Sequence, residues 1–309
     1  MTALPAPDTA EAGVDLPVEH LLGLRHVVRA DIAVPRALTA LPGGFVVRRR
    51  GRGLEVDDIR VFAEGDDVRH IDRNTTARTG IPHVRTFRDE RERTLILLVD
   101  LRPSMLWGTR RAFRSVAAAE AAALAGWRAI DGGGRVGLVA FGTGDPVVVP
   151  ARGRDRGMIA VAGGLAHAHA QALRDAASTA QDRSEPPLAA ALDLAARLAP
   201  RGASVLLASG LDQPGAGFDE AAGALTRRAD LAALIVVDAF ERHASPDLLP
   251  FVDASGTRRL GRVAETFDAD RDPRFTRLRR LGVDAVPITT TDEPATMLAA
   301  LEALDGSRR

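Results

Sequence analysis

The chain lacks three residue types whose chemistry would narrow its function. Its 309 residues contain no cysteine, no tyrosine and, because all 41 basic side chains are arginine, no lysine. The missing cysteine excludes disulfide scaffolds, thiolate-ligated zinc or iron–sulfur sites and thiol nucleophiles. The missing lysine excludes a P-loop lysine, a kinase strand lysine and any Schiff base. The chain therefore hydrolyses no nucleotide through a P-loop.

The sequence also lacks an excess of charge and a long apolar run. The 41 basic residues balance 41 acidic residues, whereas dedicated nucleic-acid binders usually carry a basic excess. The longest apolar runs, such as 231–237, fall far short of the roughly 20 residues of a membrane helix. Residues 1–15 contain neither the basic nor the apolar region of a secretory signal. We therefore expect a cytoplasmic protein with no nucleic-acid partner and no membrane span.

Composition and periodicity divide the chain into three parts. Residues 1–15 are rich in proline, alanine and acid, which is typical of a disordered lead-in. Residues 16–93 are expected to form a helix over 16–29, followed by a charged segment of short strands and turns. Residues 94–309 alternate apolar runs with helical segments, which predicts a mostly parallel sheet covered on both faces.

The predicted fold class is a doubly wound α/β domain with a small N-terminal α+β segment. The expected strands are 94–100, 135–141, 146–150, 204–209, 231–240 and 284–289. The expected helices are 112–130, 156–180, 187–199, 218–229, 272–281 and 294–304. Prolines bound the strand at 146–150, which favours an antiparallel edge strand. Ligands of such sheets bind beyond the carboxyl ends of the strands, so the loops after Asp100, around 182–188 and after Ser209 are the candidate sites.

Two short sequence patterns contain residue types that bind metal ions in other proteins. The loop after the strand 94–100 reads Asp100-Leu-Arg102-Pro-Ser104, and the oxygens of Asp100 and Ser104 could bind a hard cation such as Mg²⁺. The residues alone favour a structural role for them, as helix caps or arginine partners. His167 and His169 lie two positions apart in a predicted helix, so they point to different faces and are not expected to share a metal.

The charged segment is dense in both signs. Residues 45–93 carry 12 of the 41 arginines and 10 of the 41 acids. Three acids within seven residues could bind a cation or serve a hydrolase, but the nearby arginines favour internal salt bridges. Period-two alternation predicts a strand with Val68, His70 and Asp72 on one face.

Two resemblances follow from these residues. A strand that ends in Asp-x-x-x-Ser-Met, then a helix, then RVGLVAF and a later SVLLAS, resembles a von Willebrand factor A domain. The preceding stretch is similar to the signature of the bacterial domain-of-unknown-function family 58. The matching positions are Gly51, Gly53, Glu55, Arg60, Phe62, Gly65, Asp66, Asp67, Arg69, Ile71, Asp72, Ala77 and Arg78. Together the two resemblances cover roughly residues 20–309.

The resemblance implies a binding role and no reaction. Members of the family pair this segment with an A-type domain, and they are associated with MoxR-type AAA ATPases as adaptors or assembly factors. The expected partners are therefore such an ATPase and a client protein, and no cofactor and no enzymatic activity are expected.

The sequence departs from the A-domain pattern where a metal would bind. The metal-ion-dependent adhesion site of A domains uses Asp-x-Ser-x-Ser, with a Thr and an Asp from two other loops. Asp100 and Ser104 match the first and last positions, but Arg102 replaces the middle serine. Residues 182–186 offer no threonine, and Gly210 stands at the acid position, with Asp212 two residues later. Arg102 brings a permanent cation that could pair with Asp100 and replace the ion, so no tight metal site is expected. Arg73 also departs from the family, which usually has Trp there.

The resulting hypothesis is a protein-binding adaptor with a degenerate adhesion site. Its functional surface would be the carboxyl-end rim of the sheet with Asp100, Arg102, Ser104 and Asp212, where arginine–carboxylate pairing would replace a shared metal. Two alternatives stay open: a binding module that depends on Mg²⁺ or Mn²⁺, and a hydrolase that uses the acidic block 66–72.

Overall fold

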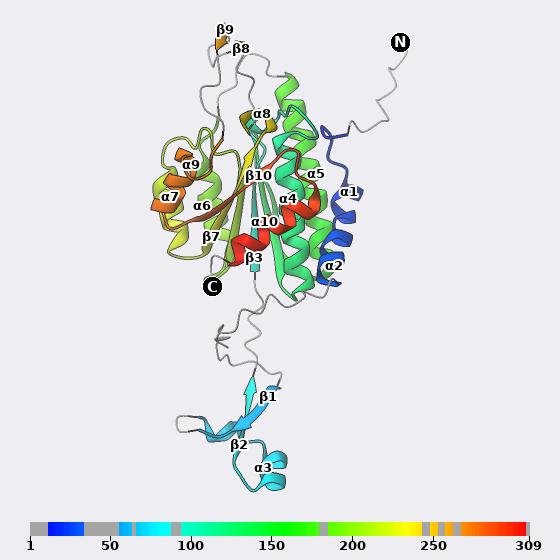
Figure 1. Cartoon of the computed structure of the whole chain (residues 1–309), viewed down its shortest axis with the longest axis vertical. Coiled ribbons are helices and arrows are strands. Elements are labelled where there is room, and N and C mark those ends of the chain that lie inside the picture. The colour runs from blue at the N-terminus through cyan, green and yellow to red at the C-terminus, as the bar shows by residue number, and fades with distance from the viewer. Residues whose placement is uncertain are drawn as a thin grey trace. The chain divides into compact units, whose positions relative to one another are not determined.

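The computed structural model describes residues 12–33, 56–63, 66–87, 94–178, 185–242, 248–252, 257–261 and 267–306. The chain divides into two compact units. The larger unit combines Met1–Val34 with Arg93–Arg309, and the smaller unit is Pro35–Glu92. We call them the sheet unit and the signature unit, and each is described by itself (Figure 1).

The sheet unit is built on a six-stranded sheet with the order β10-β7-β6-β3-β4-β5. Its strands are β3 (Thr94–Asp100), β4 (Arg135–Phe141), β5 (Val147–Gly153), β6 (Ser204–Ser209), β7 (Asp230–Val237) and β10 (Asp284–Thr289). All neighbours pair in parallel except β4 and β5, which are antiparallel. The predicted α/β class with a mostly parallel sheet is confirmed, as is the antiparallel edge strand.

Helices cover both faces of this sheet (Figure 1). Alternate residues of β3 point to opposite faces, as strand geometry requires. Leu97 and Val99 pack with α4 (Arg114–Asp131), α5 (Arg154–Ser178) and α10 (Pro294–Gly306). Ile96 and Leu98 pack with α6 (Leu188–Leu198), α7 (Phe218–Thr226) and α9 (Pro273–Arg280). The two apolar layers bury the sheet and leave its carboxyl edge as the place where polar loops meet.

The N-terminal helices α1 (Val18–Gly23) and α2 (Arg25–Ala33) belong to the sheet unit. Leu21 is fully buried, and its carbonyl accepts a hydrogen bond from Nε1 of Trp127 on α4 at 3.0 Å. The carboxylate of Glu120, also on α4, lies 2.7 Å from His20 and 2.7 Å from Arg111. From the sequence, we grouped the helix expected at 16–29 with the charged segment in residues 16–93. In the structure this stretch forms α1 and α2, which pack against α4 and, for α1, also against α5.

The chain just before α1 is also attached to the sheet unit. The backbone N–H of Phe113 donates to the carbonyl of Gly13 at 2.8 Å. Gly13 has φ 82°, and a Cβ there would lie 2.0 Å from a carbonyl oxygen, so this close approach requires glycine. The described residues 12–15 of the predicted lead-in are thus attached to the loop just before α4, and residues 1–11 lie outside the described residues.

The signature unit contains an antiparallel pair, β1 (Val56–Val61) and β2 (His83–Phe87). Between them lie the 3₁₀ helix η1 (Val68–His70) and the helix α3 (Arg73–Thr79). The predicted strand through Val68, His70 and Asp72 is therefore wrong. Asp67 and Asp72 cap the two helices, accepting hydrogen bonds from the backbone N–H of Arg69 and of Thr75. Local side-chain capping of this kind competes with strand pairing, which explains the error.

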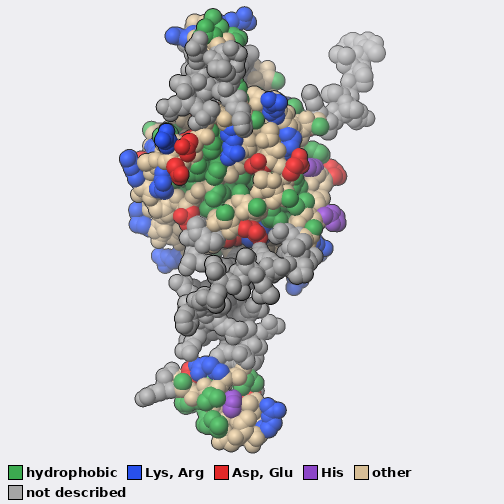
Figure 2. Space-filling model, in the orientation of Figure 1, with side chains coloured by type: hydrophobic (Ala, Val, Ile, Leu, Met, Phe, Trp, Pro, Cys, Tyr) green, Lys and Arg blue, Asp and Glu red, His purple; other side chains and the backbone are tan. Residues whose placement is uncertain are grey.

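Two further elements lie between β7 and α9: the short helix α8 (Ala239–Arg242) and a hairpin of β8 (Leu249–Val252) and β9 (Arg258–Gly261). The sequence did not predict this hairpin. Within the described residues, no helix has the length and apolar character that crossing a membrane requires. On the visible face of the sheet unit, arginine and acidic side chains are interspersed (Figure 2).

Candidate functional site

The candidate site lies at the carboxyl edge of the sheet, where β3 and β6 end side by side. Asp100 is the last residue of β3, and Ser209 is the last residue of β6. Both side chains have no exposed surface. The hydroxyl of Ser209 donates to Oδ2 of Asp100 at 2.6 Å. A buried carboxylate needs charged or hydrogen-bonded partners, so the other groups around Asp100 define the site.

Arg102 neutralises Asp100 through a bidentate ion pair. Nε of Arg102 donates to Oδ1 at 3.0 Å, and Nη2 donates to Oδ2 at 2.8 Å. The backbone N–H of Arg102 adds a third bond to Oδ1 at 3.0 Å. The arginine is 1% exposed, although guanidinium groups are almost never fully buried unless paired. The structure thus brings Asp100 and Arg102 together in the way that the sequence suggested.

The remaining nitrogen of Arg102 connects two other loops. Nη1 donates to the carbonyl of Pro186, just before α6, at 2.7 Å and to the carbonyl of Gln213, after β6, at 2.9 Å. One guanidinium therefore ties together the loops after β3, before α6 and after β6. Burial would lower the pKa of Arg102, but the hydrogen bond and charge of Asp100 outweigh it and raise that pKa above the usual value. Arg102 is a fixed cation at every working pH.

Ser104 contacts an acid that the sequence analysis missed. Its backbone N–H donates to Oε1 of Glu185 at 2.6 Å, and its hydroxyl donates to Oε2 at 3.1 Å. Oε2 also lies 3.2 Å from Nε of Arg102. Burial raises the pKa of Glu185, while the charge of Arg102 and the bonds from Ser104 oppose that rise. One sequence feature could have pointed to Glu185: it is an acid within residues 182–186, where the resemblance to A domains leads one to expect a threonine.

Asp212 belongs to a neighbouring arginine cluster. It accepts a hydrogen bond from Nη1 of Arg114 at 2.6 Å and from Nη1 of Arg274 at 3.0 Å. Arg114 is 2% exposed and donates twice more to the carbonyl of Val236, at 3.0 and 2.6 Å. Of the four predicted rim residues, Asp100 pairs with Arg102, and Arg102 and Ser104 both contact Glu185. Asp212 is instead held by Arg114 and Arg274.

Another buried acid follows β7. Asp238 has no exposed surface and accepts hydrogen bonds from the hydroxyls of Thr109, at 2.5 Å, and Thr290, at 2.8 Å. Burial acts to raise its pKa, but these bonds and those from the backbone N–H groups of Thr109 and Phe240 lower it below the usual value. Asp238 thus connects the loop after β3 with the ends of β7 and β10. No motif in the sequence indicated that Asp238 would have this role.

The acids of the signature unit also have structural partners. Asp66 accepts hydrogen bonds from Nη2 of Arg60 at 2.5 Å and from the backbone N–H of Ala63 at 2.9 Å. Asp67 and Asp72 accept from backbone N–H groups at 2.9 and 2.7 Å as helix caps. Arg69 lies in η1, and Arg78 lies in the last turn of α3. Four signature positions lie outside the described residues: Gly51, Gly53, Glu55 and Gly65.

The oxygen atoms of Asp100 are not arranged to bind a divalent cation. Both carboxylate oxygens already accept hydrogen bonds from Arg102, and one also accepts from Ser209. A hard cation would need those oxygens and would lie against a guanidinium of the same sign. Within the residues that the structure describes, no group of three His, Asp or Glu side chains is placed to hold a metal ion.

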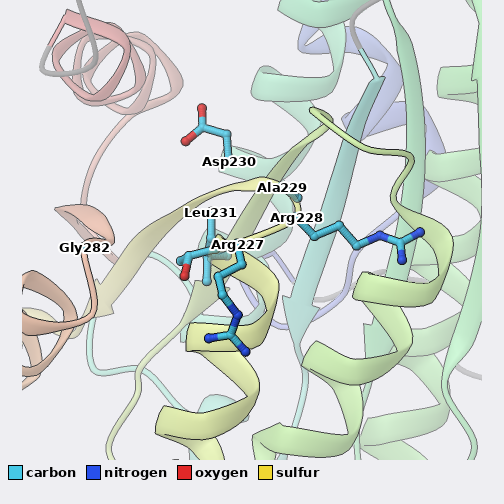
Figure 3. Close-up of a pocket in the computed structure, with 7 residues that line it drawn as sticks. Arg227, Arg228, Ala229, Asp230, Leu231 and Gly282 are labelled. Carbon is cyan, nitrogen blue, oxygen red and sulfur yellow. The ribbon is translucent and has the colours of Figure 1, made fainter.

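Two cavities in the described part of the chain lie away from this site. One of about 320 Å³ is lined by residues 226–231 and Gly282, near the starts of β7 and β10. Its labelled side chains diverge: Arg227, Arg228 and Asp230 point in three different directions (Figure 3). A second, of about 340 Å³, lies near the starts of β3 and β6. Both open at the amino ends of strands, at the edge of the sheet opposite Asp100.

The fold and the site define an α/β domain with a closed, ion-paired polar site at the carboxyl ends of its parallel strands. The chain belongs to the family described as "Protein of unknown function DUF58", which matches residues 58–258. Uncharacterized proteins of Mycobacterium bovis and of two strains of Mycobacterium tuberculosis are 37% identical to it over 102 residues. That match spans 33% of this chain and 32% of each relative's length.

Two solved structures are each similar to 69% of this chain. An aerotolerance-related membrane protein from Bacteroides fragilis shares 15% identity over 69% of this chain and 99% of its own, with a TM-score of 0.44. A membrane-spanning protein from Vibrio fischeri shares 19% identity over 69% and 98%, with a TM-score of 0.21. These descriptions contradict the cytoplasmic location expected from the sequence.

Proposed function

We propose that this chain is a non-catalytic protein-binding adaptor that works with a MoxR-type AAA ATPase and a client protein. Its sheet unit is proposed to be a von Willebrand factor A-type module in which a side chain replaces the metal. The strand order, the position of Asp100 and Ser104 after β3 and the helices on both faces support that assignment. The association with the ATPase is what the family resemblance implies.

The observation that carries the proposal is the position of the Arg102 guanidinium. In an A domain, a divalent cation links an Asp-x-Ser-x-Ser loop to two further loops. Here Arg102 bonds to Asp100 in the first loop and to the carbonyls of Pro186 and Gln213 in the other two. A covalently attached cation holds the three loops without exchange, so the rim is preorganised for a partner without a metal.

The proposal of a binding role is also supported by the state of the acids. General acid–base chemistry needs carboxyl groups that can reach a substrate. Asp100 is enclosed by Arg102 and Ser209, and Asp66 and Asp72 are bound to Arg60 and to the start of α3. The described residues therefore favour binding over the hydrolase alternative.

The test is co-purification of the full chain with a MoxR-type ATPase of the same organism, with and without ATP. Gln213 is exposed on the rim and offers its carbonyl to Arg102, so Gln213→Arg adds bulk and charge to the surface without removing a site contact. Gln171→Arg makes the same change on the exposed face of α5 and serves as the matched control.

The proposal predicts that the wild type and Gln171→Arg retain the ATPase and that Gln213→Arg loses most of it. If no form of the protein associates with the ATPase, in either nucleotide condition, the adaptor role is refuted. Equal retention by both variants would show that the partner binds away from the rim.

A further inference from the structure

The carboxylate of Glu185 occupies a nearly closed pocket of hydrogen-bond donors. The backbone N–H of Ser104 binds one of its oxygens at 2.6 Å, and the Ser104 hydroxyl binds the other at 3.1 Å. Nε of Arg102 lies 3.2 Å from that second oxygen. The Glu185 side chain is 6% exposed. Donors on both oxygens, with one permanent positive charge, make a receptor for a planar carboxylate.

Glu185 is not needed to balance the charge of the site. Arg102 already forms two hydrogen bonds to Asp100, so these two groups neutralise each other. The three loops are joined by Arg102, through the carbonyls of Pro186 and Gln213, and not by Glu185. Removing the Glu185 side chain would leave the guanidinium and its other contacts in place and would expose the donors of Ser104.

The contacts of Glu185 with Ser104 run through its side chain, whereas the backbone beside it is held separately, because the carbonyl of Pro186 accepts a hydrogen bond from Nη1 of Arg102. Glu185 precedes α6 and is 81 residues away from Ser104 along the chain. The first helical N–H of α6, at Leu188, binds the carbonyl of Pro214 and not Glu185. A rotation about the side-chain bonds of Glu185 is therefore enough to free the donors, with no change to the helix that follows.

We propose that Ser104 and Arg102 form a carboxylate-binding site, that Glu185 fills it as an internal ligand in the free chain, and that an acidic side chain of a protein partner takes its place. The replacement by a partner rests on the proposed function, whereas the carboxylate site itself does not. The partner would present a glutamate or aspartate on an exposed segment, because the rim around Asp212 and Gln213 is open to solvent.

The first experiment is chemical rescue in the full-length chain. Glu185→Ala removes the internal carboxylate and leaves the donors free, so added acetate should bind and raise the melting temperature. Wild type and Glu220→Ala, which truncates an exposed glutamate of α7, should show no such rise beyond that given by sodium chloride at equal ionic strength. An equal response of all three proteins, or no response of Glu185→Ala, would overturn the carboxylate site.

The second experiment measures competition with the internal ligand. An acetylated hexaglutamate amide should bind Glu185→Ala about ten-fold more tightly than wild type, if Glu185 fills the site in about nine-tenths of the molecules. Hexaglutamine is the control peptide. Should Glu185→Ala fail to fold, Glu185→Gln keeps the size and removes the charge, and it should still bind hexaglutamate more tightly than wild type. Equal binding to wild type, Glu185→Gln and Glu220→Ala overturns the role of Glu185.

The two proposals fail in distinguishable ways. If acetate and hexaglutamate bind Glu185→Ala but the ATPase binds no form of the chain, the adaptor role fails and the carboxylate site stands. If the ATPase binds but acetate and hexaglutamate do not discriminate between the variants, the carboxylate site fails and the adaptor role stands.

Discussion

Mild acid should destabilise the sheet unit because His169 is buried in its neutral form. His169, on α5, is 1% exposed, and its Nε2 lies 3.0 Å from the hydroxyl of the fully buried Ser115 on α4. Burial lowers the pKa of His169 from 6.5 to about 4, and the charge of Asp15 only partly opposes that. The described surroundings therefore accommodate an imidazole but not an imidazolium.

The size of this loss of stability follows from the difference in proton binding between the folded and the unfolded chain. Between the lowered folded pKa and the unfolded value of 6.5, the unfolded chain binds the proton and the folded chain does not. The contribution of His169 is thus fully present above pH 6.5 and is lost as the pH falls toward 4. At about 1.4 kcal/mol per pKa unit, the loss is about 2 kcal/mol near pH 5 and about 3 kcal/mol in full.

Urea unfolding at about pH 7 and about pH 5 measures this loss in the range where His titrates. His169→Gln keeps a hydrogen-bonding group beside Ser115 and removes the titration, so its stability should change by about 2 kcal/mol less than that of wild type over this interval. His167→Gln, an exposed position on the same helix, should behave as wild type. If His169→Gln and wild type lose the same stability between the two pH values, the buried neutral histidine is refuted.

Four further substitutions test the polar contacts of both units. Arg102→Met leaves Asp100 buried without its partner, so it should cost about 3–5 kcal/mol in urea unfolding, and adding Asp100→Asn should recover part of that loss. Glu120→Ala removes the acid on α4 that pairs with His20 of α1; trypsin should then cleave within residues 25–33 at a higher rate, and an unchanged rate would contradict the contact. Asp238→Asn should lose about 2–3 kcal/mol near neutral pH. Because folding lowers the pKa of Asp238, the advantage of wild type is present above pH 3.8 and should disappear as the pH falls below that value; a difference independent of pH would contradict this. Asp72→Ala removes the cap of α3 and should cost about 1 kcal/mol, seen as faster amide exchange in α3 but not in α4.

The strands of the sheet were predictable because each is an apolar run with clear ends. The predicted bounds 94–100, 135–141, 204–209 and 284–289 agree with β3, β4, β6 and β10. The hairpin of β8 and β9 was missed, since LPFV and RRLG show neither a long apolar run nor a clean alternation. The strand expected at 68–72 was wrong because two aspartates cap helices there.

The site was predictable only where its contacts are local in the chain. Arg102 pairs with Asp100 two residues away, and the sequence suggested that pair. Glu185 lies 81 residues from Ser104, and the Gln213 carbonyl lies 111 residues from Arg102. A backbone carbonyl leaves no mark in the residue types, so the loops that Arg102 joins appear only once the fold is known.

Titration calorimetry of Mg²⁺ and Mn²⁺ tests the central claim, that Arg102 stands where an A domain would hold a cation. The matched protein is Asp100→Ala, which lacks the carboxylate that any such ion would need. The account predicts no heat of binding with wild type and no difference between the two proteins. Micromolar binding to wild type that is lost in Asp100→Ala would contradict it and would favour a metal-dependent binding module.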